Sequence, residues 1–484
     1  MKDNRIRSLK INATLNAIKQ ICAIIFPIIS FAYASRMVGP TGIGIYSFAN
    51  SIISYHLLLS AIGVRTYAVR EGARIRKDQK ELERFCNEVF SINIVFTVFA
   101  YIILFILMNA WEKLEPYTVA LLIQSAAIIL TTIGADWINT IFEDYLYLTI
   151  RYIIIQIFSI LAMVLFVKSS NDLYKYILIC LLSSHGGNLF NIYYIRKKVQ
   201  IRFVFRMNFK KHIVPLMILF CSNIASTVYL QSDITMLRII TDDKTVGIYT
   251  VSTKVYSVVK TLVNGLTTVT VPRFSYYLGN QLYDVYKINL EKLLNYILLL
   301  VLPLSIGMYM EASNILYIFA GKEYLSGVEV IKILSFSFPF AVGACLFSYA
   351  VMMPFKKELY YLFSTTTAAI LNIVLNFFLL PKFGMNGASF TTLLAEAVVF
   401  CISIIISKGC VDLSIKITRY FPLVISGVLI IVVCLLAGKL IDNLLISTAI
   451  AVSCSCCVYA ASLILFRYPE AVEIVDIIIK KLRK

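Results

Sequence analysis

Fourteen long apolar segments, separated by short and often basic loops, constrain the fold of this chain most strongly. Each has about 20 mostly apolar residues, the length that a helix needs to cross a bilayer. Apolar residues make up 59% of the 484 residues, whereas a soluble globule keeps a more polar surface. The sequence therefore predicts an all-α polytopic membrane protein. The expected spans are 11–34, 43–63, 88–109, 118–138, 150–167, 175–195, 213–240, 248–270, 292–312, 329–351, 361–380, 387–407, 421–441 and 445–466.

Lysine and arginine are unequally divided between alternate loops, with 32 on one side of the membrane and 7 on the other. Basic loops stay on the cytoplasmic side, so we expect both termini to be cytoplasmic. The net charge of +18 sits mainly in these loops, where topology and anionic lipid headgroups account for it. We therefore expect membrane lipids as partners and no nucleic acid.

A short motif recurs in the two halves of the chain. Gly44-Ile45-Tyr46 opens the second span and Gly247-Ile248-Tyr249 opens the eighth, an offset of 203 residues. Unless the match is chance similarity between apolar segments, it predicts parallel repeats. We expect two pseudo-symmetric six-helix lobes, residues 1–205 and 206–410, around a central cavity. Residues 411–484 hold two extra spans and a cytoplasmic tail, which would serve as a groove wall, a lipid-facing prop or a partner surface.

Polar and positively charged side chains recur inside several spans. A lysine near the membrane centre costs about 3 kcal/mol, so such residues face either a tightly packed partner helix or a water-filled cavity. Lys260, about 12 residues into its span, is the strongest candidate for holding an anion or pairing with a carboxylate. The predicted cavity residues are Lys19, Arg36, Arg238, Lys254, Lys260, Asn16, Asn50 and Asn264.

Two intramembrane carboxylates are candidates for ion coupling or charge balance. Glu396 lies at mid-depth in span 12 and is an expected partner for Lys260. Asp233 and Lys254 lie at similar depth on neighbouring spans, where they would form either a structural ion pair or a cation or proton site.

Other charged residues lie near the membrane surfaces. Arg36 and Arg238 precede the two G-I-Y motifs, where they would either snorkel to the interface or attract a phosphate. Arg70 and Arg273, which match at the repeat offset, are assigned together with Asp136 to the inner mouth.

No nucleotide-binding or hydrolase motif occurs in a suitable setting, and the loops are too short for a soluble catalytic domain. We therefore expect a transporter and not an enzyme, with no cofactor and no metal site. Coupling to protons or sodium stays open.

Several segments resemble the Wzx-type flippases of bacterial surface polysaccharide synthesis, within the MATE-like or MOP superfamily. They include PIISFAYASRMVGPTGIGIY at 27–46, GVRTYAVREGARIR at 63–76, FKKHIVP at 209–215, VGIYTVSTK at 246–254 and GMNGASFTTLLAE at 384–396. The resemblance implies a flippase in the bacterial cytoplasmic membrane. It would move polyprenyl-diphosphate-linked oligosaccharide to the outer leaflet by alternating access, and polysaccharide polymerase machinery is an expected partner.

Three other functions compete with this one. A MATE-like cation-coupled exporter of small molecules would need a net acidic cavity, whereas the candidate residues are mostly basic. A flippase for peptidoglycan lipid precursors would rest on the same physical chemistry. A membrane glycan polymerase or ligase would need a large external loop, and the longest expected here is 313–328.

Overall fold

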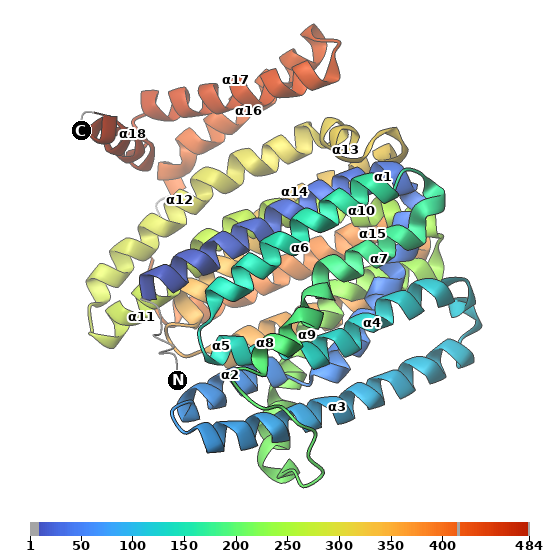
Figure 1. The fold of residues 1–484 in the computed structure, drawn as a ribbon. Helices are drawn as coiled ribbons and strands as arrows, with labels where there is room; N and C mark the ends of the chain where they lie inside the picture. Colours follow the sequence, from blue (N-terminus) through green and yellow to red (C-terminus); the bar gives the residue numbers. More distant parts are fainter. Residues whose placement is uncertain (1–8, 414–416, 483–484) are drawn as a thin grey trace. The chain divides into compact units, whose positions relative to one another are not determined.

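The structure, a computed structural model, describes residues 9–413 and 417–482, and these contain helices and connections but no β-strand (Figure 1). The all-α fold class is therefore confirmed. The α-helices are α1 (Leu9–Ala61), α2 (Val64–Ile75), α3 (Gln79–Ala110), α4 (Thr118–Gly134), α5 (Trp137–Ile141), α6 (Tyr145–Phe166), α7 (Leu173–Leu181), α8 (Gly187–Ile195), α9 (Phe209–Ile240), α10 (Asp243–Thr268), α11 (Val271–Gly279), α12 (Tyr283–Met310), α13 (Ala312–Ala320), α14 (Val328–Phe347), α15 (Glu358–Lys408), α16 (Phe421–Leu440), α17 (Leu444–Leu465) and α18 (Pro469–Leu482).

All fourteen expected spans fall on these helices. By length and composition alone, ten helical segments of the described chain can cross a membrane. The segments that contain α1 and α15 each hold two expected spans, and the other two spans lie on α7–α8 and on α10. The span on α7–α8 is interrupted by a π-helical turn at Leu182–Gly186, and α10 carries several charged residues.

Two pairs of spans follow one another almost without a loop, because the two helices within the range α1 meet at one non-helical glycine and so do the two within α15. The backbone of α1 turns at Gly39, where φ is 75°, and that of α15 turns at Gly384, where φ is 52°. Glycine has no Cβ, so it adopts these left-handed conformations at little steric cost. Pro40 follows the first kink directly and lacks the amide hydrogen that would continue the helical ladder.

Large apolar side chains cover the outer faces of the helices. Phe105 on α3 is 70% exposed, Phe158 on α6 67% and Phe377 on α15 69%. A soluble monomer rarely exposes so many large apolar side chains, but they suit contact with lipid.

Some polar groups of the spans bond within their own helix: the hydroxyls of Ser47 and Ser54 donate to backbone carbonyls four residues earlier, both at 2.7 Å.

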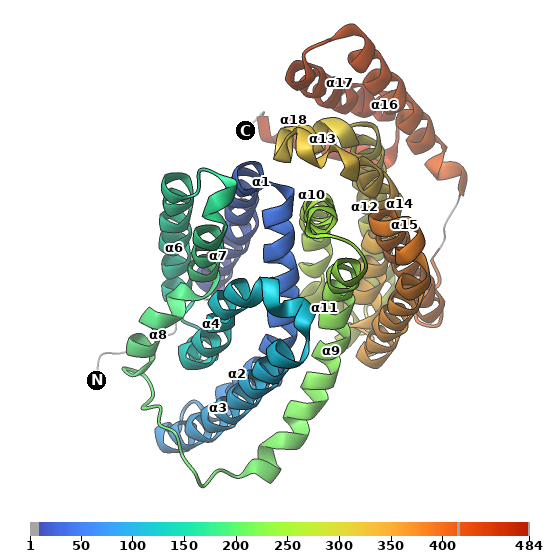
Figure 2. The same cartoon turned by 90° about the vertical axis from the view of Figure 1, so that its right-hand side faces the viewer.

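The chain divides into two compact units, residues 1–247 and 248–484. In the first unit, α3, α4, α6 and α9 pack against α1. In the second, α14 packs between α12 and α15, while α16 and α17 form a pair that joins α12 (Figure 2). The lobe boundaries proposed from the repeat stay a prediction.

The repeated motif marks a close helix crossing inside the first unit. A Cβ atom added to Gly44 would lie 1.8 Å from the carbonyl oxygen of Asp243, and one added to Gly247 would lie 1.8 Å from that of Pro40. Gly44 and Gly247 are separated by the repeat offset of 203, and so are Pro40 and Asp243. The contact is therefore reciprocal, as expected when two related segments meet around a pseudo-two-fold axis.

A buried polar chain ties α9 to α2 and α3. His212 is fully buried, and its Nδ1 lies 2.7 Å from the Tyr67 hydroxyl while its Nε2 lies 2.8 Å from the Glu88 carboxylate. Arg84 donates to the other oxygen of Glu88 at 3.0 Å. Both ring nitrogens thus have partners, which is the condition for burying polar groups without a large penalty. This cluster fixes the start of α9.

Candidate functional site

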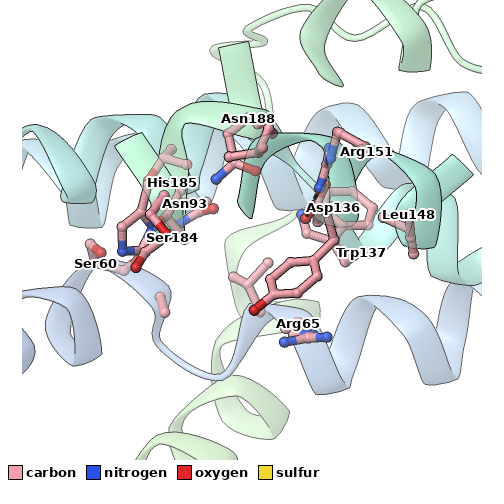
Figure 3. A pocket seen from close by; sticks show the side chains of 18 of the residues that line it. Ser60, Arg65, Asn93, Asp136, Trp137, Leu148, Arg151, Ser184, His185 and Asn188 are labelled. Carbon is pink, nitrogen blue, oxygen red and sulfur yellow. Dashed lines mark hydrogen bonds and ion pairs between the residues drawn. The ribbon is translucent and has the colours of Figure 1, made fainter. Parts of the chain in front are cut away.

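A cavity of about 340 Å³ opens inside the first unit, among α1, α2, α4, α6 and the segment 183–188. Its charged groups and its neutral polar groups lie at different ends (Figure 3). Arg65, Asp136, Trp137 and Arg151 lie at one end, and the side chains of Ser60, Asn93, Ser184 and His185 gather at the other. Lys19 also lines the cavity.

Positive charge dominates the cavity, because three cations face it and one carboxylate opposes them. Arg151 Nη2 donates to both oxygens of Asp136, at 2.9 and 2.7 Å. The second terminal nitrogen of Arg151, Nη1, is buried and has no hydrogen-bond partner among the described residues. Lys19 and Arg65 add two further charges. A cavity lined by three cations and one carboxylate is suited to bind an anion.

Small residues make room for this arrangement. A Cβ atom on Gly187 would lie 3.1 Å from Arg151 Nε and 2.7 Å from the Ile155 side chain. One on Gly134 would lie 2.5 Å from the Asn188 side chain, another lining residue. The glycines thus let α8 approach α4 and α6 closely enough to form the cavity wall.

A π-helical turn presents the neutral end. Leu182–Gly186 is π-helical, a local widening that is frequent at functional sites. The turn is held by a reciprocal pair of hydrogen bonds between Ser183 and Gln156, both at 3.1 Å. His185 Nδ1 lies 3.1 Å from the Thr131 hydroxyl. The side chains of this end can offer hydrogen bonds to a neutral polar ligand.

Outside the cavity, an ion pair and a ring stack connect the start of α6 with the end of α8 and the residues that follow it. Lys198 and Tyr194 both donate to Asp144, each at 2.5 Å, and Tyr147 stacks on Tyr194 with ring centroids 3.6 Å apart. Partial burial raises the pKa of Asp144, but the hydrogen bonds from Lys198 and Tyr194 outweigh it. The net effect is a pKa below the usual 3.8.

The structure brings only some of the predicted residues of the first unit together. Lys19 and Asp136 line the same cavity, and Asp136 pairs with Arg151. Asn16 is exposed near the start of α1. Asn50 lines a separate pocket of about 40 Å³, to which His185 also contributes.

The two arginines that precede the G-I-Y motifs differ in their surroundings. Arg238 donates to Asp243 at 2.6 Å and to the Thr241 carbonyl at 2.8 Å, and it also bonds the Tyr117 hydroxyl. These bonds hold the turn between α9 and α10. Arg36 is exposed on α1, three residues before the kink, and does not line the cavity.

In the second unit, Lys260 and Glu396 form an ion pair, with the lysine also 5.8 Å from the Tyr256 ring centroid. Glu396 is 5% exposed, so the pair lies inside the unit. Asn264 lies one turn further along α10, with its side-chain oxygen buried and unbonded among the described residues. Lys254 is half-buried on the same helix.

The remaining predicted residues lie apart. Asp233 is buried on α9 in the first unit, and its pairing with Lys254 stays a prediction. Arg70 and Arg273 are exposed on the short helices α2 and α11, where Arg70 pairs with Glu71 at 2.9 Å and Arg273 lies 5.5 Å from the Tyr277 ring centroid.

The residues that sequence reasoning missed are Arg65 and Arg151. Both lie at the edge of an apolar segment and were counted only as loop charges. For Arg151, the sequence did contain a signal: Asp136 ends one expected span, and Arg151 lies in the first turn of the next. Helix packing converts that spacing into an ion pair.

Comparison with known proteins places the chain in a family. The model of the family described as polysaccharide biosynthesis protein matches residues 9–278, more than half of the chain. A protein of Escherichia coli K12, provisionally described as an O-antigen transporter, is 23% identical over 410 residues, covering 82% of this chain and 96% of that one. An uncharacterized membrane protein of Methanocaldococcus jannaschii is 23% identical over 200 residues, and the match covers 40% of this chain and 38% of its length.

Solved structures share the fold. The inward closed conformation of lipid II flippase MurJ has a TM-score of 0.75 at 16% identity, covering 93% of this chain and 98% of that one. An inward-facing multidrug resistance MATE family transporter of the MOP superfamily has a TM-score of 0.64 at 12% identity, covering 82% and 97%. The resemblance found in the sequence is confirmed: the chain has the fold of membrane transporters of the MOP superfamily, and it belongs to the polysaccharide biosynthesis protein family.

Proposed function

We propose that the protein is a flippase that moves polyprenyl-diphosphate-linked oligosaccharide from the cytoplasmic to the outer leaflet of a bacterial cytoplasmic membrane. The supporting observation is the cavity of the first unit, where Lys19, Arg65 and Arg151 face a single carboxylate, Asp136. A diphosphate cannot enter hydrocarbon unaided, because removing water from its charges costs many kcal/mol. Fixed cations in a protein cavity offset that cost.

The two ends of the cavity suit the two polar parts of such a substrate. The charged end, with Lys19, Arg65 and Arg151, would bind the diphosphate. The neutral end, with Asn93, Ser184 and His185, would hydrogen-bond the first sugars. Trp137 lies beside the charged end. The apolar polyprenyl tail would remain in lipid.

The second unit supplies a candidate for coupling. Glu396 neutralises Lys260, so a proton or sodium ion on the carboxylate would release the ammonium group. Asp233 is a second candidate for this role, because it is a buried carboxylate on a spanning helix. Lys254, Arg36 and Arg238 remain candidates for contact with the head group during transport, and polymerase machinery remains a proposed partner.

Deletion of the gene in the bacterium that encodes it tests the proposal. We expect loss of surface polysaccharide and accumulation of lipid-linked oligosaccharide that external enzymes cannot reach. Complementation with Lys260→Ala or Arg151→Gln should fail at normal membrane expression, whereas Lys175→Ala, a change at an exposed lysine outside the cavity, should restore the polymer. Normal polymer in the deletion strain would refute the proposal.

The same deletion distinguishes the competing functions. A flippase for peptidoglycan precursors uses the same chemistry, and the fold is shared with MurJ, but its loss would stop growth. A MATE-like exporter would change resistance to cationic drugs and leave the polysaccharide intact.

A further inference from the structure

A second cavity, an apolar groove of about 480 Å³, lies within the second unit between α12 and the pair α16–α17. Its walls include Leu300, Leu304 and Met308 of α12, Ile430 of α16, and Val452 and Tyr459 of α17. From Leu299 to Glu311, the lining residues of α12 span about 18 Å along the helix axis. That is a little more than half of the ~30 Å hydrocarbon core, so it matches the depth of one leaflet.

One carboxylate closes this groove. Glu311 lies at the junction of α12 and α13, lines the groove and is 6% exposed. Asn314 donates to its Oε2 at 2.7 Å. It makes no ion pair with any residue in the part of the chain that the structure describes. A carboxylate at the end of an apolar groove therefore has an amide partner but no counter-charge, although burying an unpaired charge is costly.

We propose that the groove binds a membrane lipid with a primary ammonium headgroup, such as one that carries ethanolamine. The ammonium group pairs with Glu311, and one acyl chain follows α12 past Leu304 toward Leu300. In the orientation proposed above, Glu311 faces the outer surface, so the lipid belongs to the outer leaflet. Only this choice of leaflet rests on the orientation predicted from the loop charges.

Charge decides between this occupant and the tail of a polyprenyl diphosphate. Both supply an apolar chain, but the polyprenyl lipid would bring its negative head toward Glu311. Two negative charges at such short range repel each other in a site of low dielectric constant. The ammonium group of an aminolipid is instead attracted to the carboxylate and neutralises it. The groove is therefore a site for a resident lipid rather than for the transported one.

Native mass spectrometry of the purified full chain in a neutral detergent tests the inference. Phosphatidylethanolamine and phosphatidylglycerol with identical acyl chains are added in equal amounts. We expect one retained phosphatidylethanolamine per protein, with affinity at least tenfold above that for phosphatidylglycerol. Glu311→Gln should abolish this preference, whereas Glu323→Gln, at an exposed carboxylate near the same loop, should leave it unchanged.

A second variant protects the test against a folding defect. Leu304→Trp fills the groove from a partly exposed wall position, keeps Glu311 and should reduce binding of phosphatidylethanolamine at least tenfold. Equal retention of the two lipids, unchanged preference in Glu311→Gln, or tighter binding of a polyprenyl phosphate that competes for the groove would overturn the inference. None of these results bears on transport, which the deletion strain measures separately.

Discussion

Substitutions at Asp136 and Arg151 should change anion binding in opposite directions. Asp136→Asn removes the single negative charge that lines the cavity and keeps an oxygen that can accept from Arg151. A phosphate inside a cavity of this size lies within about 8 Å of that carboxylate, where the repulsion is worth about 1–2 kcal/mol per charge at an effective dielectric constant of 20–40. We therefore expect Asp136→Asn to bind diphosphate about 5- to 30-fold more tightly.

Arg151→Gln has the reverse effect. It removes one cation and a charge-assisted hydrogen bond worth about 1.5–3 kcal/mol, so binding should weaken about 10- to 150-fold. A purely structural role for the ion pair predicts instead that both variants lose affinity together, because each breaks the same contact.

The protein carries its own reporter for this measurement. Trp111 and Trp137 are its two tryptophans, and Trp137 lines the cavity. In a Trp111→Phe background, Trp137 fluorescence can be titrated with inorganic pyrophosphate at constant ionic strength. Glu81→Gln removes an exposed carboxylate outside the cavity and serves as the matched control. Loss of affinity in both variants, or no change in either, would refute the assignment of the cavity as an anion site.

Two further predictions concern stability in detergent. Gly44→Ala should lower the free energy of unfolding by about 1–3 kcal/mol, because the new methyl would lie 1.8 Å from the Asp243 carbonyl, whereas Gly279→Ala, with nothing within 4 Å, should be neutral or stabilising. The folded state lowers the pKa of Asp144 below 3.8, so its ion pair with Lys198 stabilises above about pH 4 and is lost as the pH falls through the lowered value. Melting temperatures between pH 3 and 7 should therefore drop more steeply for the wild type than for Asp144→Asn, and parallel curves would contradict this.

The number and position of the spans could be predicted because a bilayer requires about 20 apolar residues per helix, whatever the helix packs against. The interruptions were harder to predict. The π-helical turn at Leu182–Gly186 depends on hydrogen bonds with Gln156, which lies on another span. The break expected between spans 1 and 2 is present at Gly39, but it is a single non-helical residue where the sequence led us to expect a loop of several residues.

The candidate site was only partly predictable. The depth of a residue in the membrane can be counted along its helix, but the direction in which its side chain points depends on how that helix packs against its neighbours. Lys260 and Glu396 were expected to pair, and they do. Lys19 shares its cavity with Asp136, which was predicted, and with Arg65 and Arg151, which were not. Those two arginines lie at the edges of spans. The sequence therefore assigns them to the loops, although their side chains line the cavity.

The abrupt helix-to-helix joints at Gly39 and Gly384 also bear on how the topology can be mapped. Epitope tags and protease sites tolerate insertion where the chain is exposed and irregular, and a joint of one non-helical residue offers no such segment. Reporters placed at these two bends should disrupt folding and give false negatives. The exposed residues Glu112 and Lys113 after α3, and 168–171 after α6, are better places to ask which side of the membrane the chain has reached.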